Sequence, residues 1–162
     1  MEKCEKMLQI ITSAKELKFG ELCSVYSDDL TTLQSEQDFY WFLMDFMKSP
    51  DTFYAVWNID GRYVSALRIE PYKDGVLLAG LHTKDGYRKK GYAETLIKNT
   101  FFYISEQGIK KIYSHIRNDN ISSVRVHQKC GFEKVSDCAA YIDGSVDWKS
   151  SSYLKNVVSQ GK

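Results

Sequence analysis

Three cations immediately before a glycine form the part of the sequence best suited to chemistry. In "DGYRKKGYAETLIKN", residues 85–99, Arg88, Lys89 and Lys90 precede Gly91, and a helix-like pattern follows. The first N–H groups of a helix have no internal acceptors, and the helix dipole adds positive potential there. Gly91 has no Cβ, so a ligand can come close to the backbone, and the three cations add mobile positive charge. The stretch therefore predicts a site for a pyrophosphate-like anion.

Two common phosphate-binding motifs do not describe this loop. The P-loop pattern G-x-x-x-x-G-K-[ST] and the dinucleotide pattern G-x-G-x-x-G are both absent. An ordinary solvated basic loop remains the alternative interpretation.

The loop lies between an expected strand and an expected helix. Residues 75–83, "GVLLAGLHT", are mostly apolar and predict a strand. After Gly91 an apolar face recurs at helical spacing, and Gly108 suits the position just past the helix end. Residues 110–116 predict another strand, and residues 120–132 predict a short helix capped by Asn120 and ended by Gly131.

The other elements follow from similar patterns. Residues 7–12 predict a strand, and capping-box spacing at Ser13 and at Ser35 predicts two helices, the first running to about Tyr26. Residues 50–72 predict a hairpin about an Asp-Gly turn, and residues 132–142 and 146–154 predict two more strands. The order β-α-α-β-β-β-α-β-α-β-β predicts an α/β (α+β) mixed sheet with helices on both faces, in one domain covering residues 1–162.

Two motifs in this order of elements resemble one known family. The pattern R-x-x-G-x-A, at Arg88, Gly91 and Ala93, resembles the Q/R-x-x-G-x-G/A signature of the GNAT superfamily of acyl-CoA-dependent N-acyltransferases. Further on, "NISSVRVHQKCGF", residues 120–132, resembles the family's second signature, an Asn that opens a short helix ending in Gly-Phe. The order of elements also matches the family's across nearly the whole chain.

The resemblance implies a fold and a binding site for acetyl-CoA. The implied sheet is mainly antiparallel, has about six to seven strands, and splays between its fourth and fifth strands, where Gly80 would tolerate a bulge. Backbone groups of the fourth strand and of the loop would hold the pantetheine arm and the pyrophosphate, with Asn120 on the pantetheine arm. The implied binding residues are Leu81, His82, Thr83, Arg88, Lys89, Lys90, Gly91, Tyr92, Ala93 and Asn120.

The catalytic acid departs from the family pattern. Many members carry a Tyr seven residues after the Asn, which protonates the leaving sulfur, but that position here is His127. A His can donate a proton near neutral pH. If His127 acts as this acid, His127→Phe lowers kcat and leaves acetyl-CoA binding nearly intact. Packing of His127 beside Phe132, with the thiolate leaving unaided, is the alternative.

The sequence identifies the catalytic base less clearly than the catalytic acid. Some members place a carboxylate or His where this chain has Leu77 and Ala79, which cannot accept a proton. His82 has the opposite strand parity, so we interpret it as a packing or surface residue despite its place in the binding strand. His115 can face the cleft and is the candidate base, with solvent as the alternative.

By resemblance, the first two helices and their connection line the acceptor pocket. Asp28, Asp29, Glu36 and Asp38 would attract a cationic amine there, or else form a solvated face and helix caps. The aromatic cluster Phe39, Tyr40, Trp41, Phe42 and Phe46 is interpreted mainly as core, with Tyr40 or Trp41 as the alternative pocket walls.

Composition excludes several other classes of function. The net charge of +1 gives no reason to expect nucleic-acid binding, and no apolar run is long enough to span a bilayer. The charged N-terminal segment does not resemble a signal peptide, which favours the cytoplasm. No His and Cys occur at zinc-ligand spacing, so we expect no metal, and the four cysteines are expected to be free thiols. A role for Cys130 as acyl carrier is disfavoured, because a helix C-terminus raises a thiol pKa.

The resulting hypothesis is an N-acetyltransferase that moves an acetyl group from acetyl-CoA to a small-molecule or peptide amine by direct attack in a ternary complex. It would be a monomer or homodimer and would need no metal. The alternative is a CoA-binding regulatory domain without turnover. Nucleic-acid binding through Arg88 to Lys90 is a weaker third hypothesis, since no wider basic stripe accompanies these residues.

Overall fold

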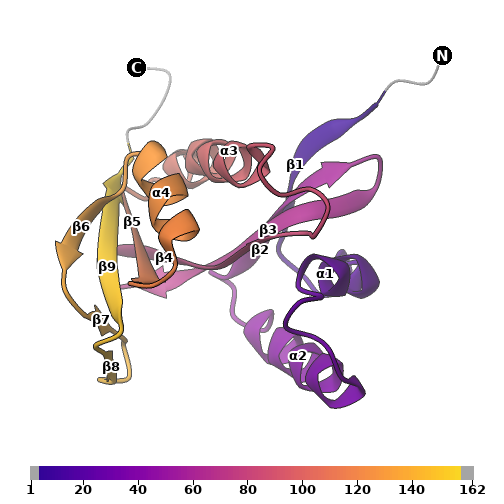
Figure 1. Ribbon diagram of the computed structural model, residues 1–162, viewed down its shortest axis with the longest axis horizontal. Helices are drawn as coiled ribbons and strands as arrows, with labels where there is room; N and C mark the ends of the chain where they lie inside the picture. Colours follow the sequence, from indigo (N-terminus) through magenta and orange to yellow (C-terminus); the bar gives the residue numbers. More distant parts are fainter. Residues whose placement is uncertain (1–3, 158–162) are drawn as a thin grey trace. The chain divides into compact units, whose positions relative to one another are not determined.

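The computed structural model describes residues 4–157 as four helices and nine strands (Figure 1). The helices are α1 (Phe19–Val25), α2 (Leu33–Phe46), α3 (Tyr92–Glu106) and α4 (Ile121–Lys129). The strands are β1 (Lys6–Ile11), β2 (Phe53–Ile59), β3 (Arg62–Tyr72), β4 (Gly75–Thr83), β5 (Lys111–Arg117), β6 (Glu133–Ser136), β7 (Ala139–Ala140), β8 (Val146–Asp147) and β9 (Ser150–Asn156).

Seven strands form one mixed sheet in the order β1-β2-β3-β4-β5-β9-β6. The pairs β1/β2, β2/β3, β5/β9 and β6/β9 are antiparallel. The pair β4/β5 is parallel, with Val76–Leu78 opposite Ile112–Ser114. The mixed, mainly antiparallel sheet predicted from the sequence is confirmed.

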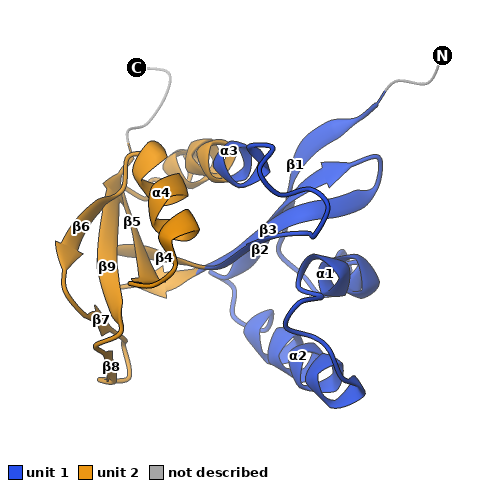
Figure 2. Cartoon of the chain, viewed as in Figure 1, with its two compact units in different colours: residues 1–69, 80–96 blue, residues 70–79, 97–162 orange. Residues whose placement is uncertain are grey.

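The chain divides into two compact units (Figure 2). One unit, called unit 1 below, comprises residues 1–69 and 80–96, and unit 2 comprises residues 70–79 and 97–162. The boundaries fall within β3, β4 and α3. A single domain covering residues 1–162 stays a prediction.

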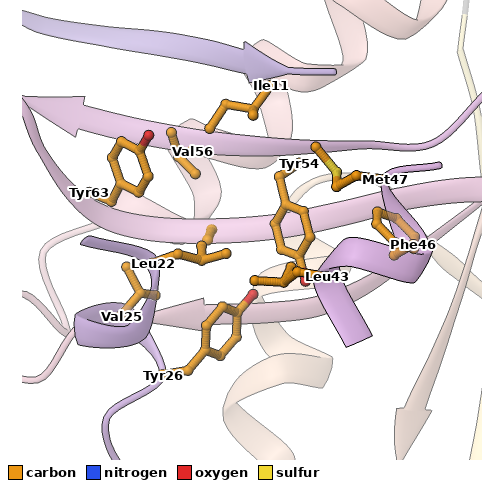
Figure 3. Packing of buried hydrophobic residues seen from close by; sticks show 11 residues of the cluster. Ile11, Leu22, Val25, Tyr26, Leu43, Phe46, Met47, Tyr54, Val56 and Tyr63 are labelled. Atoms are coloured by element: carbon orange, nitrogen blue, oxygen red, sulfur yellow. The ribbon is translucent and has the colours of Figure 1, made fainter. Parts of the chain in front are cut away.

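The core of unit 1 gathers buried side chains from β1, α1, α2, β2 and β3 (Figure 3). Leu43 and Phe46 face inward from α2, and the Phe46 ring meets Tyr54 edge-on at 5.6 Å. Each large side chain fully buried in this way contributes about 1.5–3 kcal/mol. The core members are Ile11, Leu22, Val25, Tyr26, Leu43, Phe46, Met47, Tyr54, Val56, Tyr63 and Ala66.

Both predicted helix starts in unit 1 were wrong. The first helix begins at Phe19, because the Lys18 N–H donates to the Tyr63 hydroxyl at 3.2 Å and leaves the helical pattern. Ser13 and Glu16 form only a turn, with the Ser13 hydroxyl donating to Glu16 at 3.1 Å. The second helix is capped by Thr32, since the Ser35 hydroxyl at the third helical position can complete a capping box.

Unit 2 contains a small hairpin that the sequence did not predict. The two strand-like runs near the C-terminus are each divided, giving β6 and β7, then β8 and β9. An Asp-Gly turn joins β7 to β8: the Asp143 carboxylate accepts from the Ser145 N–H at 2.9 Å, and Gly144 has φ +91°. Local side-chain hydrogen bonds of this kind stabilise the tight turn between the two runs.

Candidate active site

The loop from β4 into α3 places an open stretch of backbone at a helix N-terminus. The carbonyl of Gly91 accepts the first helical hydrogen bond, from the Thr95 N–H at 3.0 Å. Gly91 has φ +82°, a left-handed conformation that favours glycine. A Cβ built at Gly91 would meet no atom within 4 Å. The backbone therefore faces free space at the point where the helix dipole attracts an anion.

Arg88 does not contribute mobile charge to this loop, contrary to the sequence-based expectation. Its Nε donates to the Thr83 carbonyl at 2.8 Å, and its Nη2 donates to the Asp28 carboxylate. The same Nη2 lies 3.1 Å from His82 Nε2. The Arg88 guanidinium holds the pKa of Asp28 below its usual range. Arg88 thus ties the loop to the end of β4 and to the α1–α2 connection, and Lys89 and Lys90 are the exposed cations outside this ion pair.

β4 changes its backbone conformation at Gly80, which has φ +62°. A Cβ there would lie 2.7 Å from Arg68 Nη1, the end of a flexible side chain, so the positive φ is the stronger reason for glycine. The buried Tyr26 hydroxyl donates to the Gly80 carbonyl, and the Tyr26 ring stacks on His82 at 5.4 Å. Burial raises the pKa of Tyr26 well above 10, so the hydroxyl stays protonated and remains a donor.

The three predicted binding residues at the end of β4 differ in their environments. The His82 carbonyl accepts from Ser65 Oγ at 3.1 Å, and Thr83 Oγ1 lies 3.0 Å from the same hydroxyl. The His82 ring lies between Tyr26 and Asp28, as expected for a packing residue. Leu81 continues the strand between Gly80 and His82.

Asn120 and His127 belong to α4 in unit 2. The Asn120 side-chain oxygen accepts from the Ser123 N–H at 3.2 Å, which confirms Asn120 as the helix cap. His127 is only 1% exposed and packs edge-on against Phe132 at 5.0 Å. Its Nδ1–H donates to the Ser123 carbonyl at 2.7 Å, and its Nε2 lies 3.0 Å from Ser114 Oγ. Burial lowers the pKa of His127, so the ring is neutral near pH 7 and its Nε2 accepts from Ser114.

His115 lies on the opposite face of β5 from His127. Ser114 points to His127, and the next residue along a strand points to the other face. The His115 ring meets Tyr141 edge-on at 4.8 Å and Tyr72 edge-on at 5.3 Å. Neither ring nitrogen has a hydrogen-bond partner within residues 4–157, and burial lowers the pKa of His115. His115 is therefore a neutral imidazole with an unused lone pair.

A family model described as Acetyltransferase (GNAT) family matches residues 14–132. This chain belongs to that family. The match includes both motifs that suggested it, R-x-x-G-x-A and the helix opened by Asn120.

Solved GNAT structures have the same fold at low sequence identity. The ribosomal-protein-S18-alanine N-acetyltransferase of Escherichia coli is 12% identical, with a TM-score of 0.68, and the match covers 96% of this chain and 97% of that one. The ribosomal-protein-alanine N-acetyltransferase of Brucella melitensis is 16% identical, with a TM-score of 0.69 and coverage of 93% and 99%. The PaiA N-acetyltransferase of Thermoplasma acidophilum, in complex with coenzyme A, is 13% identical, with a TM-score of 0.67 and coverage of 93% and 99%. No curated protein sequence matches.

The structure groups the candidate residues of this GNAT protein in two sets. Residues 81–93 lie together in unit 1, whereas His115, Asn120 and His127 lie in unit 2. Because His115 and His127 occupy opposite faces of β5, they cannot form one acid–base pair.

Sequence reasoning missed Tyr26 and Asp28. Both residues act on parts of the chain more than fifty positions away, at Gly80 and Arg88, and no local pattern marks them. An acidic residue in the helix connection was noted only as a possible attractor for an amine. The available signal for Asp28 was its charge, since a carboxylate can pair with the arginine of the motif.

Among the described residues, no group of His, Cys, Asp and Glu could hold a metal ion. The four cysteines are free thiols, as predicted. None of the described helices has the length and apolar character needed to cross a bilayer.

Proposed function

We propose that this GNAT protein transfers the acetyl group of acetyl-CoA to a primary amine by direct attack in a ternary complex. The observation that carries the proposal is the open backbone at Gly91, which combines a left-handed glycine, a helix N-terminus and free space. Membership of the acetyltransferase family supports the same reading.

The residues at the start of α3 fit the pyrophosphate of CoA. The N–H groups of residues 88–93 would hold it, with Lys89 and Lys90 as the mobile cations, because Arg88 is engaged by Asp28. Leu81 and Thr83 would offer backbone groups to the pantetheine arm, and Asn120 would contact it from α4. When bound, acetyl-CoA supplies an activated acyl group on a thiolate leaving group.

Acetyl transfer needs a neutral amine and a hydrogen-bond donor to the developing oxyanion. The attacking amine must be neutral, and an alkylammonium has a pKa of about 10, so a base or water must remove its proton. His115 is the candidate base, because its imidazole is neutral and neither nitrogen is engaged within the described residues. Both nitrogens are buried, however, and solvent is the alternative base. A backbone N–H of β4 near Gly80 would donate to the developing oxyanion.

The contacts of His127 favour departure of the thiolate without a protein acid. Both ring nitrogens face α4 and β5 partners, and the lowered pKa keeps the ring unprotonated near pH 7. A thiolate with a pKa of about 8.5 is a tolerable leaving group unaided. We therefore assign His127 a positioning role, in which it fixes the helix that Asn120 opens.

The acceptor is proposed to be a small or peptide amine. Two of the structures with the same fold are N-acetyltransferases of ribosomal-protein alanine, which supports a polypeptide amine. Cytoplasmic location and a monomeric or homodimeric state belong to the same proposal.

Calorimetric titration with acetyl-CoA and CoA tests the cofactor, and chromatographic detection of CoA released in the presence of an amine panel tests turnover. Chromatography is preferred to a thiol reagent, because Cys4 is exposed. We expect saturable binding and amine-dependent release. Absence of binding at millimolar CoA would overturn the proposal.

A CoA-binding regulatory domain without turnover is the second candidate. It is favoured by one observation, the buried His127 in place of the family's Tyr. Binding of CoA without release on any amine of a broad panel would select it.

A further inference from the structure

Residues 19–47 carry a strong negative charge, which the near-neutral net charge of the whole chain does not reveal. This segment contains no Lys, Arg or His, although the whole chain has a formal charge of +1. Its carboxylates are Glu21, Asp28, Asp29, Glu36, Asp38 and Asp45. Since Asp28 is neutralised by Arg88, the uncompensated part lies mainly on α2 and its flanks.

α2 also has exposed apolar side chains outside its core-facing side. Leu43 and Phe46 point into the core of unit 1, and Phe39 packs against it. On another side, Leu33 is 72% exposed, Trp41 is 68% exposed and Tyr40 is 40% exposed, so the expectation that this aromatic cluster is core is wrong for Trp41. The Tyr40 ring also meets Phe19 edge-on at 5.3 Å. At about 100° per residue these three side chains project within one sector of the helix. We call Leu33, Tyr40 and Trp41 the α2 stripe.

Carboxylates border the α2 stripe on both sides. With the same rotation per residue, Glu36 lies on one side of it, and Asp38 and Asp45 lie on the other. All three are exposed, and within residues 4–157 none of them forms an ion pair. Asp38 accepts a hydrogen bond from Gln34 at 2.8 Å. Exposed apolar side chains bordered by unpaired carboxylates suit a ligand that carries both aliphatic and cationic groups.

We propose that the α2 stripe is a docking surface for a basic segment of another polypeptide. Lys and Arg side chains suit it, because their aliphatic stems can lie along Leu33 and Trp41 while their charged ends reach the bordering carboxylates. The indole of Trp41, which is the more exposed of the two rings, adds cation–π attraction.

Charge complementarity selects this occupant over two others. A second copy of the chain placed symmetrically on the α2 stripe would bring the same carboxylates together, and like charges repel. An anionic membrane surface is repelled for the same reason. The docking does not depend on acetyl transfer, but if the proposed function holds, the bound segment is the one that carries the acceptor amine.

Fluorescence anisotropy with the full chain tests the docking surface. The probe is a short labelled peptide of lysine, alanine and serine, and the control peptide has glutamate in place of each lysine. We expect only the lysine peptide to bind. We expect Trp41→Ala to raise the Kd for this peptide about fivefold. The matched control is Trp148→Ala in unit 2, since Trp148 is 74% exposed and we expect no change there.

A second set of variants isolates the charges. We expect the triple variant Glu36→Gln, Asp38→Asn, Asp45→Asn to weaken binding and to flatten its dependence on salt. The control triple variant Asp51→Asn, Glu106→Gln, Glu133→Gln removes the same charge from exposed sites elsewhere and should leave binding unchanged. Circular dichroism checks that each variant is folded.

Three outcomes would overturn the proposal. The first is equal binding of the two peptides, and the second is an equal effect of Trp41→Ala and Trp148→Ala. The third is a dimer in sedimentation that Trp41→Ala alone converts to a monomer, because the surface would then belong to a homodimer. A failure of CoA binding would leave all three readouts intact, so this proposal and the proposed function fail separately.

Discussion

At the scale of the residue, the hydroxyl of Tyr26 holds the conformation of β4 at Gly80. Tyr26→Phe removes the donor to a carbonyl at the position where the strand takes a positive φ. Loss of that hydrogen bond should lower the free energy of unfolding by about 1–3 kcal/mol. Because β4 would orient the acyl group, we expect kcat to fall about tenfold or more, with little change in the Kd for CoA.

Tyr63→Phe is the control for this substitution. Tyr63 is fully buried in the same unit, and its hydroxyl accepts from the Lys18 N–H at 3.2 Å, away from β4. A similar loss of stability with unchanged kcat is expected. If the two variants have the same kcat, Tyr26 is only a packing residue. Denaturant unfolding and steady-state kinetics provide the two measurements.

A second prediction at this scale concerns pH and His127. Its pKa in the folded chain lies below the unfolded value of about 6.5, so the unfolded chain binds more protons as the pH falls. Its contribution to stability is therefore fully present above about pH 6.5 and is lost as the pH falls through the folded pKa. We expect the Tm of the wild type to fall from pH 7 to pH 5, and the fall to be smaller in His127→Phe. His115 retains its part of the slope, because its pKa is lowered as well.

Kinetics of the same variant distinguish positioning from acid catalysis. His127→Phe leaves Ser114 and the Ser123 carbonyl without their ring partner, so lower stability at pH 7 is expected. At a temperature where the variant is folded, kcat should change by no more than about twofold, since the thiolate can leave unaided. A large fall in kcat with unchanged CoA binding would restore His127 as the acid.

At the scale of the element, the two ends of α3 provide a matched pair of glycines. Gly91 has φ +82° and Gly108 has φ +81°, and a Cβ at either position would meet no atom within 4 Å. Alanine at either site should therefore cost about 1 kcal/mol of stability through backbone strain alone. Only Gly91→Ala places a methyl group against the proposed pyrophosphate, so only this variant should weaken CoA binding, by about tenfold or more.

Calorimetry on both variants decides the matter. Equal CoA affinity for Gly91→Ala and Gly108→Ala would show that the N-terminus of α3 does not contact the ligand. If the two variants are equally stable but differ in CoA affinity, backbone strain cannot explain the difference. That result would support pyrophosphate binding at the N-terminus of α3.

Most elements of this fold follow from periodicity, but their ends do not. β4, α3, β5 and α4 were predicted close to their observed bounds, because each has a continuous apolar pattern and a Gly or Asn at its limit. The start of α1 was missed because Tyr63, far along the chain, takes the Lys18 N–H. The division of each C-terminal run was missed because local hydrogen bonds, from the Cys138 N–H to Ser136 and from the Lys149 N–H to Asp147, form turns inside the two strand-like runs.

The candidate site likewise combines local features, which the sequence shows, with tertiary contacts, which it does not show. The glycine before α3 and the Asn cap of α4 are local features, and the sequence located both. The engagement of Arg88 by Asp28 and of Gly80 by Tyr26 depends on tertiary contacts between distant segments. The buried state of His127 also depends on β5, so residue type and spacing could suggest an acid but not its environment.

At the scale of the whole molecule, a net charge of +1 results from opposite local charges rather than from their absence. Residues 19–47 contain only acidic charges, whereas residues 84–91 contain Lys84, Arg88, Lys89 and Lys90 with one aspartate. Both segments lie in unit 1. The prediction that neutral net charge excludes a nucleic-acid partner therefore concerns the whole surface, while small anions and basic peptides can each find a local site.

The last prediction follows from this distribution and separates local from overall charge. Lys89→Gln with Lys90→Gln should weaken CoA binding by about tenfold at low salt, since these are the exposed cations beside the start of α3. Lys48→Gln with Lys110→Gln lowers the net charge equally from exposed positions outside the loop and should leave the affinity unchanged.

Ionic strength sharpens this comparison, because the Debye length falls from about 10 Å at 0.1 M salt to about 3 Å at 1 M. The affinity of the wild type should therefore decrease with salt and approach that of Lys89→Gln with Lys90→Gln. Titration calorimetry over a series of salt concentrations measures both slopes. Parallel slopes for the two double variants would mean that CoA responds to the overall charge of the protein, and the loop before α3 would then have no special role in binding it.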